Sequence, residues 1–74
     1  MPELPIISGD VAIKVFESLG FKIVRQRGSH KVLRKKDRGC VIPVHKELAS
    51  GTLRSAIKQA GITVEEFIIA YTNR

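Results

Sequence analysis

The side chain best suited to chemistry in this sequence is the imidazole of His30. It follows the turn-forming pair Gly28 and Ser29 and lies between Arg27 and Lys31. Imidazole accepts and donates protons near neutral pH, and a phosphate docked on the neighbouring cations would lie beside it. Cleavage of RNA without a metal ion needs a base for the 2′-hydroxyl proton and an acid for the leaving 5′-oxygen. We therefore predict that His30 is an acid-base catalyst.

A second histidine, His45, stands at the end of a predicted strand, and two roles are open to it. It is either the second proton carrier or a hydrogen-bonding residue of the loop that follows, and we favour the loop role. Arg25, Arg27 or Lys31 would stabilise the charge that develops on the phosphorane. Acid-base help alone contributes about 10²- to 10⁴-fold, which suits a slow nuclease.

The bases around His30 account for the whole charge surplus of the chain. Its 74 residues include 13 Lys and Arg against seven Asp and Glu, a formal net charge of +6. The window 22–38 carries +7, with Asp37 as its single acid, and the remainder carries −1. The bases of this window are Lys22, Arg25, Arg27, Lys31, Arg34, Lys35, Lys36 and Arg38. Such a cluster favours a polyanionic partner.

RNA is the polyanion that this pattern favours. The bases lie on predicted strands and turns, whereas DNA reading usually uses a helix and membrane anchoring a basic amphipathic helix. No aromatic residue lies between Lys22 and Leu48, so stacking on nucleobases is not expected. The predicted contacts run from the eight bases and Ser29 to phosphates and 2′-hydroxyls.

The start of the predicted middle helix offers a second place for an anion. Ser50, Gly51 and Thr52 would expose unpaired backbone N–H groups there, and Arg54 follows within one turn. Thr52 and Arg54 therefore join the predicted RNA-binding residues. Capping of the helix by the Ser50 hydroxyl is the alternative to anion binding, because the cap would use the same backbone N–H donors.

Three amphipathic helices are predicted from apolar residues that recur at i, i+3, i+4 and i+7. The first covers about residues 9–19, with Ser8 as its N-cap and Gly20 in a left-handed turn after it. The second follows the polar segment around residue 50. The third opens with a capping box of Thr63 and Glu66.

A three-stranded meander is predicted between the first two helices, because β-branched residues alternate there with bases. Its strands span 21–27, 30–34 and 40–45, joined by turns at Gly28-Ser29 and Asp37-Arg38-Gly39. Pro43 cannot donate to a ladder, so the third strand is expected at an edge. The order α-β-β-β-α-α predicts an α+β fold, with helices on one face of the sheet and basic side chains on the other.

Several other functions are disfavoured by composition. With 43% hydrophobic residues and no Trp, residues 1–74 predict a single small domain without a large buried cofactor. Cys40 cannot form an intramolecular disulfide and has no zinc spacing with the histidines, so no metal and no small-molecule cofactor is expected. No spanning segment is seen, and Met1–Pro5 lacks signal-peptide features, so we expect a cytoplasmic protein without membrane contact.

Three motifs occur in order along the chain: G-S-H at 28–30, P-V-H at 43–45 and G-T-L-R-x-x-x-K-Q-A-G-I at 51–62. With Leu19-Gly20-Phe21, Glu47-Leu48 and Glu65-Glu66-Phe67, they resemble the HicA toxin family over nearly the whole chain. The resemblance implies a double-stranded-RNA-binding-like fold and an endoribonuclease, an mRNA interferase, with His30 as the catalytic histidine. It also implies neutralisation by a HicB-type antitoxin. A non-catalytic RNA-binding module of the same fold is the alternative.

Overall fold

The computed structural model describes residues 4–73, which fold into three helices and one antiparallel sheet. The elements are α1 (Gly9–Ser18), β1 (Lys22–Arg27), β2 (His30–Lys35), β3 (Arg38–Pro43), α2 (Ser50–Ala60) and α3 (Val64–Thr72). This order confirms the predicted α+β fold. The segment Met1–Pro5, for which no signal peptide was predicted, lies partly outside the described residues.

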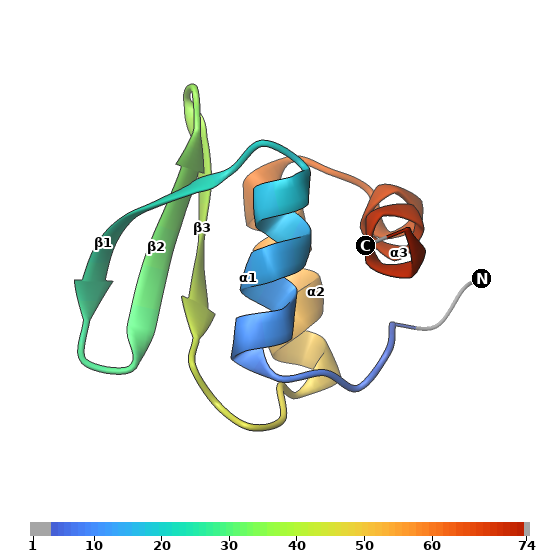
Figure 1. The fold of residues 1–74 in the computed structure, drawn as a ribbon, viewed down its shortest axis with the longest axis horizontal. Helices are drawn as coiled ribbons and strands as arrows, with labels where there is room; N and C mark the ends of the chain where they lie inside the picture. Colours follow the sequence, from blue (N-terminus) through green and yellow to red (C-terminus); the bar gives the residue numbers. More distant parts are fainter. Residues whose placement is uncertain (1–3, 74) are drawn as a thin grey trace.

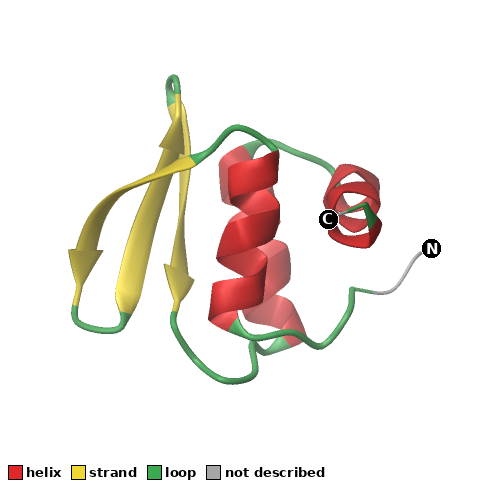
Figure 2. Ribbon diagram, viewed as in Figure 1, coloured by secondary structure: helices red, strands yellow, loops and turns green. Residues whose placement is uncertain are grey.

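The elements are arranged in three layers, with the sheet on one side, α1 and α2 in the middle and α3 beyond them (Figure 1). The strand order is β1-β2-β3, so β3 lies at an edge, as Pro43 predicted. Figure 2 shows that β3 is the strand nearest the middle helices and β1 the farthest. All six residues of β1 are exposed, so the sheet joins the core mainly through β2 and β3.

Phenylalanine rings link the layers inside a mainly aliphatic core. The Phe16 ring of α1 lies 5.5 Å from that of Phe21 and 5.4 Å from that of Phe67 in α3. Leu33 and Ile42 from the sheet are fully buried in the same cluster. The central helix α1 therefore contacts both outer layers and fixes the sheet relative to α3.

The predicted helix ends are largely confirmed. The Ser8 hydroxyl accepts a hydrogen bond from the Val11 N–H (3.1 Å), and Gly20 adopts a φ of +100° after α1. At α3, the Thr63 hydroxyl accepts from the Glu66 N–H, and the Glu66 carboxylate accepts from the Thr63 N–H. Local sequence signals thus define these two helices.

The third strand lies two residues earlier than predicted. The turn before it consists of Lys36 and Asp37, with Lys36 at a φ of +57°, so the predicted turn at Asp37-Arg38-Gly39 is wrong. Gly39 instead lies inside β3, where an added Cβ would approach the Leu33 carbonyl oxygen to 2.8 Å. This glycine is needed for close contact between strands rather than for the turn.

Two backbone hydrogen bonds tie the loop after β3 to distant segments. The Val44 N–H donates to the Ser29 carbonyl (2.6 Å), just before His30, and the Gly9 N–H donates to the His45 carbonyl (2.8 Å). A Cβ on Gly9 would collide with the Pro43 carbonyl. The absence of a side chain at Gly9 therefore lets α1 hold the loop that carries His45.

Gly9→Ala should lower the free energy of unfolding by about 1–3 kcal/mol, because the added methyl group pushes α1 away from the β3 loop. Gly51→Ala is the matched control, since nothing lies within 4 Å of its added Cβ. Thermal unfolding measures both, at about 4–8 °C per kcal/mol for a domain of this size. Equal melting temperatures for the two variants would contradict the close approach.

Candidate nucleic-acid interface

The register of the sheet determines which bases share a face with His30. Directly paired residues of an antiparallel sheet project to the same face. The pairs on the His30 side are Arg27 with His30, Arg25 with Val32, Lys22 with Arg34, His30 with Pro43, Val32 with Val41 and Arg34 with Gly39. We call this surface the open face; its charged and titratable side chains are Lys22, Arg25, Arg27, His30 and Arg34.

A β-bulge in β1 places two of these arginines on the open face. The register shifts between Ile23 and Arg25, so Val24 is an extra residue without a partner in β2. Strict alternation from Lys22 would turn Arg25 and Arg27 toward the helices. The inserted residue reverses that parity and aligns both arginines with His30.

The other four bases of the window do not belong to the open face. Lys31, Lys35 and Arg38 share the opposite side of the sheet with buried residues such as Leu33, and Lys36 lies in the turn. The sequence had placed all eight bases on one face. The structure divides them because the bulge and the turn set the parity of each strand.

Two of these off-face cations bind the ends of helices. The Lys35 Nζ donates to the Leu19 carbonyl after α1 (2.8 Å) and lies 6.0 Å from the centre of the Phe21 ring. The Arg38 Nη1 donates to the Gly61 carbonyl after α2 (3.0 Å). Helix C-termini carry partial negative charge, so both contacts favour the fold.

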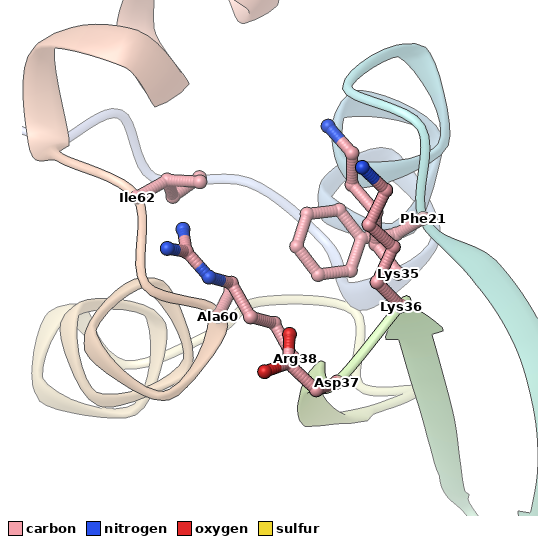
Figure 3. A pocket seen from close by; sticks show the side chains of 7 residues that line it. All are labelled: Phe21, Lys35, Lys36, Asp37, Arg38, Ala60 and Ile62. Atoms are coloured by element: carbon pink, nitrogen blue, oxygen red, sulfur yellow. The ribbon is translucent and has the colours of Figure 1, made fainter.

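These contacts surround a cavity of about 270 Å³ between the β2–β3 hairpin and the helix ends. Figure 3 shows the Arg38 side chain reaching from the hairpin toward Ala60 and Ile62, with Lys35 beside the Phe21 ring. Carbonyl ends of two helices approach this place, which disfavours an anion there. At this cavity, therefore, Lys35 and Arg38 connect the hairpin to the ends of the two helices, and the cavity is not a phosphate site.

A second, open cavity of about 520 Å³ contains His30. Its lining comes from the sheet, the loop after β3 and one side of α2: His30, Val41, Pro43, His45, Gly51, Thr52, Ser55, Ala56 and Gln59. Both histidines thus line one cavity. The His45 carbonyl accepts a hydrogen bond from the Gly9 N–H, which helps to hold the loop after β3. The His45 imidazole is exposed and forms no hydrogen bond with the described residues.

The start of α2 meets this cavity without a side-chain cap. The N-cap is Ala49, which offers no side-chain hydrogen bond, and Ser50 is already the first helical residue. The alternative that the Ser50 hydroxyl caps this helix is therefore excluded. Gly51 and Thr52 line the cavity, whereas Arg54 is exposed and does not line it. The positive end of α2 faces the space beside His30, an arrangement suited to an anion.

Ser55 and Gln59 were missed as site residues. They stand four and eight residues after Gly51, and this spacing puts all three on the same side of α2. Helical spacing from the predicted anion site could have identified them. Arg54 was predicted instead from its charge, without regard to the face of the helix on which it lies.

Cys40 and metal chemistry lie outside this arrangement. Cys40 is 2% exposed, and burial raises the pKa of its thiol to about 11, so it stays protonated and unreactive at neutral pH. Within residues 4–73, no three His, Cys, Asp or Glu side chains are grouped so as to hold a metal ion.

Comparison with known protein families assigns the chain to one of them. A family model described as "HicA toxin of bacterial toxin-antitoxin" matches residues 9–62, from the start of α1 to just past α2. The chain belongs to the HicA toxin family. The match contains the whole open face and all residues that line the His30 cavity. No match was found among curated proteins or solved structures.

Membership of the HicA toxin family connects this chain with bacterial toxin-antitoxin systems and implies an antitoxin partner. The third helix, α3, lies outside the matched range. Among residues 4–73, no helix combines the length and the hydropathy needed to cross a membrane.

Proposed function

We propose that this HicA-family protein is a metal-independent endoribonuclease that cuts messenger RNA in the cytoplasm and uses His30 for proton transfer. The supporting observation is that one cavity joins His30 of β2 to the uncapped start of α2. Arg27 is the direct cross-strand neighbour of His30 on the open face. A phosphodiester held there would have a proton carrier on one side and hydrogen-bond donors on the other.

The reaction that fits these groups is transfer within the RNA backbone. One imidazole takes the proton of the 2′-hydroxyl, and the 2′-oxygen forms a bond to phosphorus. The bond from phosphorus to the 5′-oxygen breaks, and an imidazolium supplies a proton to that oxygen. The products are a 2′,3′-cyclic phosphate and a 5′-hydroxyl, so atoms and charge balance without an added cofactor.

In this proposal His45 carries the second proton transfer, rather than the loop role that the sequence favoured, because it lines the same cavity as His30. Both line the cavity, and the cross-strand pair of His30 with Pro43 holds the strand end near the loop that carries His45. Arg27 and the first-turn N–H groups at Gly51 and Thr52 stabilise the charge on the phosphorane oxygens. The open-face bases dock the flanking phosphates.

Incubation of the purified protein with end-labelled mRNA in EDTA tests the function. We expect cleavage that EDTA does not stop, with cyclic phosphate and 5′-hydroxyl ends on the fragments. Binding without cleavage at protein excess would instead establish the non-catalytic RNA-binding module. Cleavage that EDTA abolishes would show that a metal ion, and not a pair of histidines, does the chemistry.

The antitoxin in this proposal is of the HicB type and covers the open face. Four basic side chains and His30 project from that face, so an inhibitor must offer acidic groups or steric cover there. The reading frame beside the gene should therefore encode a small acidic protein.

A further inference from the structure

The His30 cavity continues into a neighbouring cavity along the sheet. This second space, about 420 Å³, lies over β2 and β3 toward Arg34 and the turn at Asp37. The two cavities share two lining residues, Val41 of β3 and Gln59 of α2. They therefore form one groove between the open face and α2, and these two residues mark its middle.

The shared residues differ in chemistry from the ends of the groove. Val41 is 41% exposed, so part of its apolar side chain is accessible from the groove. Gln59 is exposed and forms no hydrogen bond with the described residues. Among the described residues that line the two cavities, Gln59 is the only carboxamide.

An apolar surface next to a carboxamide fits a nucleobase better than a phosphate. A base has an apolar face, which can lie on Val41, and an edge with neighbouring donors and acceptors. The Gln59 side chain offers one carbonyl acceptor and an NH₂ donor, so it can form two hydrogen bonds with such an edge. Phosphates would be held instead by the cations and by the start of α2.

The length of α2 sets the distance between the phosphate contact at its start and the base contact at Gln59. Eight residues separate Gly51 from Gln59, a rise of about 12 Å along the helix. An unstacked single strand covers more than about 3.4 Å per nucleotide, the spacing of a stacked one, so this distance corresponds to about three nucleotides or fewer. The base at Gln59 would thus be a near neighbour of the cleaved bond in the same strand.

We propose that Val41 and Gln59 form a nucleobase subsite that determines the sequence preference of cleavage. The subsite rests on the proposed ribonuclease function, whose reaction at His30 it would direct. A single strand is required, because a paired base would not expose its edge to Gln59. The preference would be confined to one position, within about three nucleotides of the cut.

Mapping of cleavage sites on a randomised RNA tests this subsite. Gln59→Met keeps the length of the side chain but removes its hydrogen bonds, so the base preference at one position should vanish and cleavage of the best site should fall about tenfold. Gln59→Glu leaves only acceptors and should shift the preference toward a base that presents an amino group. Gln26→Met is the matched control, because Gln26 lies on the other face of the sheet and donates to the Gly28 carbonyl.

The outcomes separate this inference from the proposed function. An unchanged base preference in both Gln59 variants, or a uniform loss of rate at all sequences, would overturn the subsite while leaving the nuclease in place. If the wild-type protein cuts no RNA, the proposed function fails and the subsite fails with it. Melting temperatures of the variants should match the wild type, since Gln59 is exposed.

Discussion

His30→Ala should reduce the rate of RNA cleavage by at least about 10²- to 10⁴-fold, the size of the contribution from general acid-base catalysis. The imidazole is exposed and belongs to no part of the hydrophobic core, so its removal should leave the melting temperature nearly unchanged. RNA affinity should also change little, because the open-face bases remain. Single-turnover cleavage, thermal unfolding and fluorescence anisotropy with labelled RNA measure the three quantities.

His45→Ala provides the companion measurement. Because His45 lines the same cavity as His30, we expect a loss of about 10²-fold or more, together with the disappearance of one limb of the pH-rate profile. An unchanged profile would return His45 to the loop role. Full cleavage by His30→Ala would remove His30 from the mechanism, whatever the result for His45.

The salt dependence of RNA affinity should correspond to phosphate contacts from the four open-face bases, and not from all eight bases of residues 22–38. Each phosphate contact to a single strand contributes about −0.7 to the slope of log K against log salt concentration. Four contacts predict a slope of about −2.8, and eight would predict about −5.6. Replacing Lys22, Arg25, Arg27 and Arg34 together by alanine should nearly abolish the salt dependence.

The off-face bases supply controls of the same charge. Lys36→Ala should leave the slope unchanged, because Lys36 lies in the β2–β3 turn. Lys35→Met should also leave it unchanged but should lower the melting temperature, since it removes a cation from a helix C-terminus. A slope that falls equally for all eight single variants would show that the RNA is not confined to the open face.

The sequence predicted the helices well because their signals are local. Ser8, Thr63 and Glu66 form their capping hydrogen bonds with residues three positions away, so side-chain chemistry and spacing were sufficient. The first turn, Gly28-Ser29, was predicted correctly for the same reason. The position of His30 directly after it could therefore be inferred without tertiary information.

The errors occurred where a distant segment determines the role of a residue. Gly39 suggested a turn, but the nearby Leu33 carbonyl is what requires a glycine there. Lys35 and Arg38 suggested RNA contacts, yet their side chains donate hydrogen bonds to carbonyls 16 and 23 residues away. Such pairings depend on how the hairpin packs against the helix ends, which composition and periodicity do not reveal.

The candidate site was predicted in its chemistry but not in its extent. His30 and the start of α2 were predicted from residue types, whereas Gln59 and Val41 were not predicted as site residues because neither is charged or a recognised catalyst. Their importance arises only when β3 and α2 are placed side by side. Non-local packing is thus what turns two ordinary residues into the centre of a groove.

The bulge at Val24 has a genetic consequence. A deletion of one codon there would leave the net charge at +6 and would remove no buried residue, since Val24 is 55% exposed. The strand would return to strict alternation with Lys22, Arg25 and Arg27 still opposite Arg34, Val32 and His30, so both arginines would stay on the open face. An in-frame loss of the three nucleotides that encode Val24 would therefore change neither the amount of charge nor the face of the sheet that carries it.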